Sequence, residues 1–157
     1  VDFNPAADRL RVTSDTGQNL RHDLNTDTTT PDGTLAYVPA ATATIAGAAY
    51  TNNDLDATTA TSLFDIDTNL DQVALQSPPN AGALVATGKL TLDVDPGAGF
   101  DIYTSLRSGV AVGNRGFAVL STAGAPGLYR VNLLTGKATL IGTFDTSVVD
   151  LAIPLDQ

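Results

Sequence analysis

Apolar and polar residues alternate in short runs along the chain, and the clearest run covers residues 127–144, GLYRVNLLTGKATLIGTF. Tyr129 and Val131 alternate with Arg130 and Asn132, a turn-like LLTGK segment follows, and apolar residues then resume. Alternation on both sides of a short break is typical of a β-hairpin. The run therefore predicts two antiparallel strands joined by a short loop.

Two more segments align with this hairpin, NLRHDLNTDTTT and SLFDIDTNLDQVALQS. The residues that open the three loops are Asp23, Asp67 and Asn132. The residues that close them are Asp27, Asp71 and Gly136. Loops of this kind often end in a left-handed residue, a conformation that Gly, Asp and Asn tolerate better than other residues. We therefore expect one loop conformation in all three copies.

The opening residues of these loops are 44 and 65 residues apart. A spacing of about 40 to 45 residues is typical of a four-stranded propeller blade, and the longer spacing would hold an insertion within residues 76–99. This pattern predicts blades at residues 1–40, 41–99 and 100–147. Residues 148–157, which begin VVDLAIP, would supply the opening strand of a further blade.

Composition agrees with an all-β fold, because every one of the 17 acidic residues is Asp, only two residues are Lys, and Met is absent. Good helix formers are thus scarce, whereas Thr, Val, Asp, Asn and Gly favour strands and turns. We predict a β-propeller-like arc of about three blades plus one strand; a β-sandwich or an irregular all-β fold is the alternative. Three blades leave the ring open, since closed propellers have about 4 to 8.

The net charge of −9 argues against nucleic acid and against anionic membrane surfaces, because both require a cationic face. The absence of Cys excludes disulfides and thiolate chemistry. No apolar run is long enough to cross a bilayer, so we expect no membrane insertion. An open arc instead predicts a protein partner, either missing N-terminal propeller blades or further copies of the chain.

Acidic residues cluster in the segments NNDLD and LFDIDTNLD. Ca²⁺ prefers carboxylate and carbonyl oxygens, and Asp54 and Asp56 offer alternating ligands in one loop. Counting from Asp54 puts Asp65 at position twelve of an EF-hand, but Thr59 stands where Gly is required and Asp replaces Glu. Asp65 and Asp67 align with residues on a solvated strand face. Solvated aspartates are the preferred interpretation, and a Ca²⁺ site at Asp54, Asp56 and Asp65 is the alternative; no other cofactor is expected.

His22 is the only histidine, so any catalytic triad or histidine–metal site would depend on it. It aligns with Val131 and Ile66, and neither Cys nor a G-x-S-x-G motif accompanies it. We interpret His22 as a polar substitution on a strand; a general base or a ligand in a central channel is the alternative.

Arg9, Arg11 and Arg21 form a basic cluster in which Arg9 and Arg11 alternate with apolar residues. The preferred interpretation is a solvated strand face whose arginines pair with nearby aspartates, and the alternative is an anion site.

The runs VDFNPAADRLRV, SDTGQNLR, GAAYTNN, LFDIDTNLDQ, PPNAG and GFDI, followed by LYRVNLLTGKATLIG, closely resemble the bacterial domain-of-unknown-function family 4394. They occur in the family's order along nearly all of the chain. The resemblance implies a secreted, propeller-like protein, of which this chain corresponds to the C-terminal two-thirds; the propeller-like segment that precedes VDFNP in other members is missing. It implies no activity, substrate or catalytic residue.

We therefore expect a non-enzymatic scaffold or interaction module, secreted or on the cell surface, that self-assembles through open strand edges. The alternative from another class is a hydrolase or lyase with a metal-supported, Asp-rich site in the propeller channel.

Overall fold

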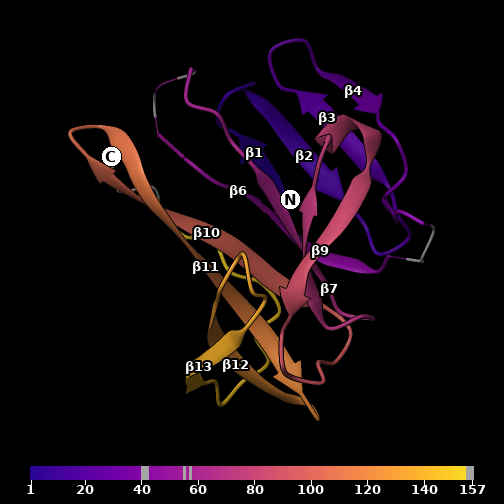
Figure 1. Cartoon of the computed structure of the whole chain (residues 1–157), viewed down its shortest axis with the longest axis vertical. Coiled ribbons are helices and arrows are strands. Elements are labelled where there is room, and N and C mark those ends of the chain that lie inside the picture. Colours follow the sequence, from indigo (N-terminus) through magenta and orange to yellow (C-terminus); the bar gives the residue numbers. More distant parts are fainter. Residues whose placement is uncertain (40–42, 55, 57, 155–157) are drawn as a thin grey trace.

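The computed structural model describes residues 1–39, 43–54, 56 and 58–154. Within these residues the chain is all-β, as predicted, with thirteen strands in three sheets that we name A, B and C (Figure 1). The one helical element among them is a 3₁₀ turn, Pro79–Ala81. None of the helical structure in this part of the chain is long and apolar enough to cross a membrane.

Sheet A is an antiparallel meander of four short strands, which lie in the order of the chain. They are β1 (Asp2–Asn4), β2 (Arg9–Thr13), β3 (Asn19–Asp23) and β4 (Thr28–Pro31). The residues of β4 are all exposed, and Pro31 ends it, so its free edge is poorly suited to pairing with another strand.

Sheet B is a second four-stranded meander with one added strand. The meander consists of β6 (Ile45–Tyr50), β7 (Leu63–Asp67), β8 (Gln72–Gln76) and β9 (Ala83–Lys89). The two-residue strand β5 (Ala36–Tyr37) pairs in parallel with β9 and covers that edge.

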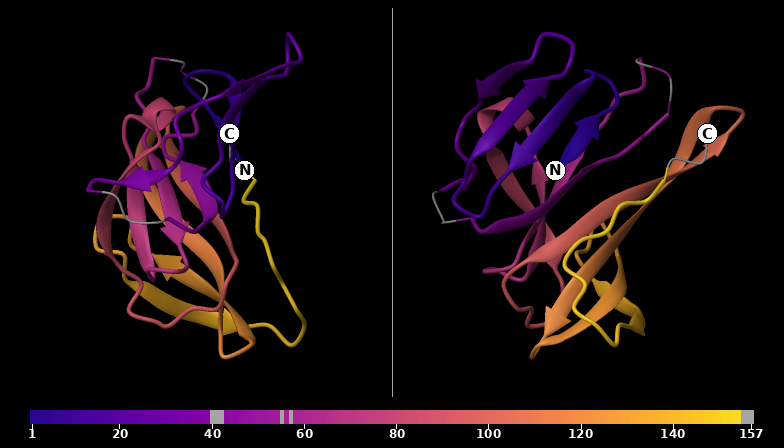
Figure 2. Two further views of the ribbon diagram at one scale, coloured as in Figure 1. Left: turned by 90° about the vertical axis from the view of Figure 1, so that its right-hand side faces the viewer. Right: turned by 180° about the vertical axis from the view of Figure 1, so that it is seen from behind.

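Sheet C is a third four-stranded meander, made of β10 (Ala98–Arg107), β11 (Val110–Thr122), β12 (Ala125–Val131) and β13 (Ala138–Thr143). The first two strands are much longer than the others, and their hairpin extends away from the rest of the sheet (Figures 1 and 2). A register shift at Ser105 bends the hairpin near its tip.

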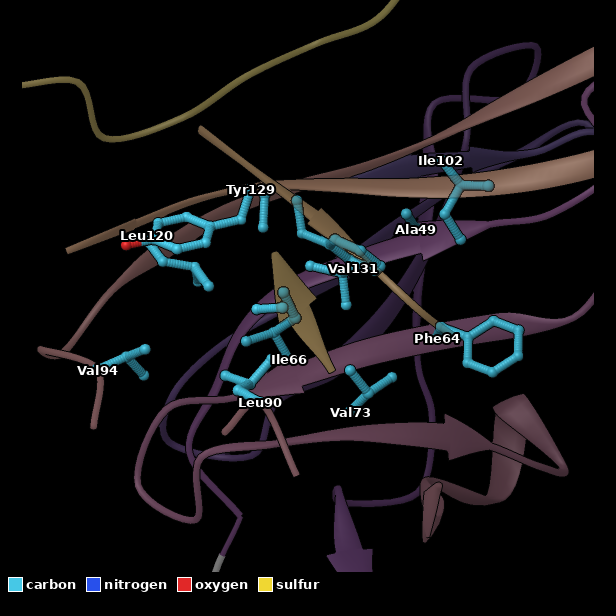
Figure 3. Close-up of a cluster of buried hydrophobic side chains, with 13 residues drawn as sticks. Ala49, Phe64, Ile66, Val73, Leu90, Val94, Ile102, Leu120, Tyr129 and Val131 are labelled. Carbon is cyan, nitrogen blue, oxygen red and sulfur yellow. The ribbon is translucent and has the colours of Figure 1, made fainter. Parts of the chain in front are cut away.

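Sheet B is the middle of three layers, and all five residues of β7 are buried. Phe64 and Ile66 of β7 contact the apolar side chains of sheet C (Figure 3). Alternation along the strand turns Asp65 and Asp67 to the other face, where sheet A lies. A strand covered on both faces cannot show a simple apolar and polar alternation.

The main hydrophobic core lies between sheets B and C (Figure 3). It comprises Ala49, Phe64, Ile66, Val73, Leu90, Val94, Phe100, Ile102, Ala118, Leu120, Tyr129, Val131 and Ala138. A smaller cluster of six buried residues, including Tyr37 and Leu84, lies on the opposite face of sheet B. No described side chain of sheet A belongs to any buried hydrophobic cluster, so sheet A is attached by other means.

The three loops expected to share one conformation do share it. In each, the side-chain oxygen of the opening residue accepts a hydrogen bond from the backbone N–H two residues later, at 2.9 Å in Asp23, 3.0 Å in Asp67 and 3.0 Å in Asn132. The closing residues have positive φ angles of 51° at Asp27, 49° at Asp71 and 73° at Gly136. The predicted left-handed closing residue is therefore confirmed in all three loops, and the hydrogen bond of the opening side chain is a further feature that they share.

A fourth loop of this type joins β1 to β2 and was missed by the sequence analysis. Asn4 Oδ1 accepts a hydrogen bond from Ala6 N at 2.9 Å, and Asp8 closes the loop with a φ of 48°. The segment NPAAD has the same five-residue spacing as the other loops, so the pattern was visible in the sequence.

The spacing of these loops does not measure the distance from one blade to the next. The loop joins the third and fourth strands in sheets A and C, but the second and third strands of the meander in sheet B. Its geometry depends only on a few local backbone contacts, so it can close any hairpin. The insertion expected within residues 76–99 is instead strand β9 and the connection to β10.

Residues 148–154 form no strand, which corrects the predicted opening strand of a further blade; residues 155–157 lie outside the described residues. The segment returns along β10 toward the tip of the β10–β11 hairpin (Figure 2). The backbone of Asp150 and Leu151 lies against Gly99 of β10. Ile153 N donates to the side chain of Asp101 at 2.7 Å.

Candidate functional site

A cavity of about 630 Å³ lies where β1, β6 and β10 approach one another. The charged side chains that line it are all acidic, namely Asp2, Asp15, Asp101 and Asp150. Gly47 of β6 packs so closely against β10 that a Cβ there would meet the Cβ of Phe100 at 2.7 Å. The first strands of the three meanders thus surround one acidic space.

Two of these carboxylates already accept hydrogen bonds from backbone N–H groups. Asp2 Oδ2 accepts a hydrogen bond from Tyr50 N at 2.6 Å, and Asp101 Oδ2 accepts one from Ile153 N. Burial raises the pKa of Asp2 to about 6, although the hydrogen bond from Tyr50 works in the opposite direction. These carboxylates join separate segments of the chain. Because their oxygens are used in this way, few are left for a ligand.

A larger groove of about 720 Å³ lies at the rim where the end of sheet B meets the face of sheet C that carries Arg130. Its floor and walls come from the end of β6, the start of β7, strands β11 to β13, and the β12–β13 loop. Its lining residues are Thr51, Asn52, Ser62, Phe64, Asn114, Arg115, Arg130, Val131, Asn132, Leu133, Leu134, Thr135, Lys137 and Thr139.

Amide hydrogen bonds fix one wall of this groove. Asn114 of β11 donates to Asn52 Oδ1 at 2.7 Å, and its own oxygen accepts from Asn52 N at 2.9 Å. The same oxygen accepts from Thr104 Oγ1 at 2.9 Å. This reciprocal pair joins sheet B to sheet C at the rim.

The opposite wall is the β12–β13 loop, which is anchored on sheet B. Thr87 Oγ1 donates to Leu133 O at 2.7 Å, and Gly136 packs directly on the backbone of Gly88. Ala138 N donates to Leu90 O at 3.0 Å. Both walls are therefore held by contacts that exist without any ligand.

Residues 1–152 match the family model described as "Domain of unknown function (DUF4394)". The chain belongs to this family. No curated protein and no solved structure matches it. The resemblance found in the sequence is thus confirmed at the level of the family, which carries no activity to transfer.

In this DUF4394 chain the three residues of the predicted Ca²⁺ site do not come together as one group of ligands. Asp54 Oδ1 accepts from Asp56 N at 3.0 Å, and its Oδ2 accepts from Ala111 N at 3.2 Å. Asp56 accepts from Thr58, and Asp65 lies inside β7. Among the described residues, no three His, Cys, Asp or Glu side chains form a group that could hold a metal ion. The Ca²⁺ site stays a prediction without structural support.

Asp65 and Asp67 are not solvated, which corrects the prediction for this strand face. Both are fully buried, on the face of β7 that the hairpin alignment assigned to solvent. Asp67 accepts a hydrogen bond from Tyr37 Oη at 3.0 Å. Neither oxygen of Asp65 has a hydrogen-bond partner, and burial raises its pKa to about 8.

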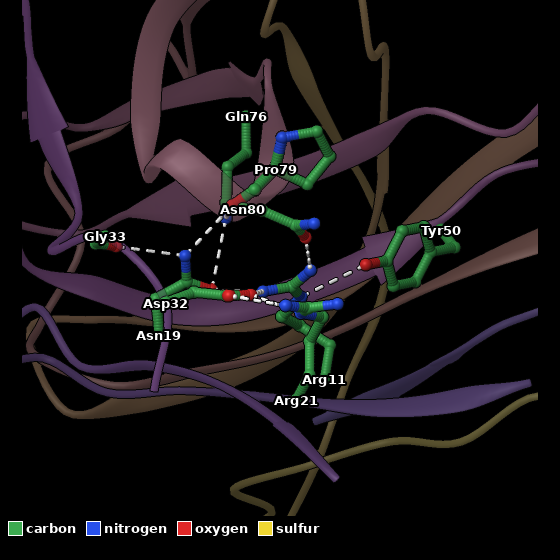
Figure 4. Close-up of polar contacts among 9 residues, drawn as sticks. All are labelled: Arg11, Asn19, Arg21, Asp32, Gly33, Tyr50, Gln76, Pro79 and Asn80. Atoms are coloured by element: carbon green, nitrogen blue, oxygen red, sulfur yellow. Dashed lines mark hydrogen bonds and ion pairs between the residues drawn. The ribbon is translucent and has the colours of Figure 1, made fainter. Parts of the chain in front are cut away.

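The arginine cluster is structural and only partly solvated (Figure 4). Arg11 is 2% exposed and donates to Asp32 at 2.7 Å, to Asn80 at 2.8 Å and to Tyr50 Oη at 3.1 Å. Arg21 donates to both oxygens of Asp32. The predicted pairing with aspartates is confirmed, whereas Arg11 is buried where sheet A meets sheet B.

Asn19 completes this network by donating to Gly33 O and Pro79 O at 3.0 and 2.9 Å (Figure 4). Although burial opposes it, hydrogen bonds from Arg21 and Arg11 keep the pKa of Asp32 below its usual value. Among the described residues of this DUF4394 chain, sheet A is therefore joined to sheet B by a network of polar side chains and not by a cluster of apolar ones.

His22 lies on β3, where its Nδ1 is 2.9 Å from Thr29 Oγ1 and its Nε2 is 3.8 Å from Asp27. Its strand position agrees with the sequence interpretation. Neither of the two main cavities of the domain includes His22 in its lining.

The face of sheet A that carries His22 is apolar and partly exposed. Phe3 pairs with Leu10, and Val12 pairs with Leu20, so all four side chains share this face. Phe3 is 46% exposed and the other three are half-buried. The apolar alternation in β2 is visible in the sequence, whereas the partial exposure of this face in the described chain is not.

The cationic residues of the groove were also missed. Arg130 and Lys137 occur within the hairpin that the sequence analysis described first, but Arg115 comes from a different hairpin. Their proximity depends on the antiparallel pairing of β11 with β12, in which Phe117 lies opposite Arg130 and Arg115 follows just beyond the last pair.

Proposed function

We propose that this chain is a non-enzymatic interaction module, built as a propeller-like arc of three four-stranded blades. Three consecutive meanders support the propeller-like arrangement, together with the approach of their first strands β1, β6 and β10 around one cavity. An exported or cell-surface location belongs to this proposal, as the family resemblance implies.

The partly exposed apolar face of sheet A carries the proposal. In a stack of blades each sheet packs against the next, as sheet B does against sheet C. The face formed by Phe3, Leu10, Val12 and Leu20 has the composition of such a contact but is partly exposed. A contiguous apolar patch of this kind marks an interaction site. Its occupant in this proposal is a further sheet, supplied in solution by a second copy of the chain.

Edge strand β13 offers a second route to assembly. It carries neither charge nor proline, and Leu140 and Ile141 are 52% and 54% exposed. An unprotected edge of this kind can pair with another chain. The edge of β4 is less suitable because it ends at Pro31.

The alternative, a hydrolase or lyase with a metal-supported acidic channel, has less support. Asp2 and Asp101 of the acidic cavity are engaged with backbone N–H groups. Asp54, Asp56 and Asp65 do not line that cavity.

Sedimentation velocity at several protein concentrations tests the proposal. The wild-type chain should form dimers or larger species as concentration rises, and Phe3→Ser should shift the equilibrium toward monomer. Val38→Ser, at an 82% exposed residue outside sheet A, is the matched control and should change nothing. Ile141→Lys reports separately on the β13 edge. A wild-type chain that stays a compact 16.1 kDa monomer at every concentration would refute self-assembly.

A further inference from the structure

We propose that the groove at the rim of sheets B and C binds an acidic saccharide, a polyhydroxylated ligand that carries carboxylate groups. Every charged side chain that lines the groove is cationic: Arg115, Arg130 and Lys137. Cations are rare in this chain, which has eight Lys and Arg residues against 17 aspartates. Three of the eight therefore face one space.

The three groove cations are free to receive a ligand, whereas four of the other five Lys and Arg residues are already engaged; the fifth, Arg107, lies outside the groove. Arg9, Arg11 and Arg21 form ion pairs with aspartates, and Lys89 donates to a backbone carbonyl. Within the described residues, the three groove cations have no ion pair and no side-chain hydrogen bond. A guanidinium group binds a carboxylate through two parallel hydrogen bonds, so Arg115 and Arg130 suit that group.

The three cations come from separate elements, which spreads positive charge along the groove. Arg115 lies on β11 beyond the end of its pairing with β12, Arg130 lies on β12, and Lys137 lies in the β12–β13 loop. A ligand with several anionic groups would contact more than one of them. A volume of about 720 Å³ is within the usual range for small-molecule sites.

The remaining lining favours a saccharide over a simple anion. Thr51, Ser62, Thr135 and Thr139 supply hydroxyl groups, and Asn132 supplies an amide. Asn132 Oδ1 is used within its own loop, which leaves its NH₂ group for a ligand. Hydroxyls and amides can both donate and accept, which matches the hydroxyl groups of a sugar.

The groove also has an apolar side that could receive the carbon face of a sugar ring. Leu134 is 74% exposed at the rim, and Leu133 and Phe64 lie below it. Because the Asn52–Asn114 pair and the Gly88–Gly136 contact already fix the walls, binding requires little ordering of the protein.

Isothermal titration of the full chain with trigalacturonate, maltotriose, citrate and phosphate tests this proposal. Trigalacturonate should bind, and it should bind more weakly in about 0.5 M than in about 0.05 M NaCl because exposed charges are screened. Maltotriose, which is neutral, should bind at least about tenfold more weakly. Citrate and phosphate, which carry charge without sugar rings, should also bind more weakly than trigalacturonate.

Variants locate the site. Arg115→Gln and Arg130→Gln should each weaken trigalacturonate binding about tenfold, because each removes a charge-assisted hydrogen-bond donor. Arg107→Gln, at an exposed arginine outside the groove, is the matched control. Circular dichroism checks that each variant is folded, and Lys137→Gln provides a third groove variant if one of them is not.

Three outcomes would overturn the proposal. Equal binding of trigalacturonate and maltotriose would refute the role of charge, and tighter binding of citrate or phosphate would refute the saccharide. Unchanged affinity in all groove variants would place the site elsewhere. Since Phe3→Ser should not affect this binding, its outcome is independent of the proposed self-assembly.

Discussion

Gly88 of β9 and Gly136 of the β12–β13 loop are in direct backbone contact across the interface of sheets B and C. A Cβ on either residue would overlap the backbone of the other segment. The β12–β13 hairpin, which was clearest in the sequence, can therefore lie directly on sheet B because neither glycine has a side chain. Gly136 also has a φ of 73°, in the left-handed region that glycine adopts without steric cost.

Gly88→Ala should therefore lower the free energy of unfolding by about 1 to 3 kcal/mol, the usual cost of overpacking. The overlap involves backbone atoms, which cannot move as a flexible side chain would. Urea denaturation followed by circular dichroism measures the change. Gly142→Ala on β13, where a Cβ would meet no atom within 4 Å, is the matched control and should alter stability little. Equal stability of both variants would contradict the close packing described above.

The Arg11–Asp32 pair leads to a second prediction, because it joins sheet A to sheet B without an apolar core. Asp32→Asn removes the negative charge that pairs with both Arg11 and Arg21. The positive charge of Arg11 then stays buried without an ion-pair partner. Breaking one partner of a buried pair costs about 3 to 5 kcal/mol. Urea denaturation measures this loss. Since the pKa of Asp32 is lowered in the fold, its contribution is present above the ordinary carboxyl pKa and lost as pH falls below it.

Arg9→Gln is the control for this effect. It removes the Arg9–Asp23 pair, which lies at 2.9 Å on the same sheet but with Arg9 36% exposed. Exposed pairs contribute little to stability, so this variant should unfold close to the wild type. A loss as large as that of Asp32→Asn would mean that surface charge, and not the buried network, holds sheet A.

Local features of this fold could be predicted from the sequence because they depend on local chemistry. Asp27, Asp71 and Gly136 adopt the expected left-handed conformation, which needs only the loop's own side-chain oxygen and backbone. The strands on either side follow from the alternation of Tyr129 and Val131 with polar residues. The same local character makes the spacing of these loops a poor measure of the distance from one sheet to the next, because an identical loop closes hairpins at different places in the sheets.

Features that depend on packing between sheets could not be predicted in this way. Asp65 and Arg130 align in the hairpin repeat, yet Asp65 is fully buried and Arg130 is exposed in the groove. The difference arises because sheet B is covered on both faces whereas Arg130 lies on an open face of sheet C. A single sequence does not show which sheet is the middle layer.

The buried carboxyl of Asp65 leads to the last prediction. Its pKa rises from 3.8 to about 8, chiefly through burial, so the folded state keeps the proton between these values while the unfolded state loses it. The Asp65 carboxyl contributes its full stabilisation to the folded state below the ordinary carboxyl pKa. This contribution to the free energy of unfolding is lost as pH rises toward 8. The slope contributed is at most about 1.4 kcal/mol per pH unit. Urea denaturation between these pH values should show the wild-type free energy of unfolding falling as pH rises.

Asp65→Asn cannot ionise and should flatten this slope, whereas Asp93→Asn, at an exposed carboxyl, should leave it unchanged. Asp65→Leu should be at least as stable as the wild type at pH 8, because it replaces two buried acceptors without partners by an apolar side chain of similar size. If the leucine variant were instead much less stable at pH 8, the carboxylate of Asp65 would have to make favourable contacts in the folded chain, and its burial would not be the cause of the pH dependence.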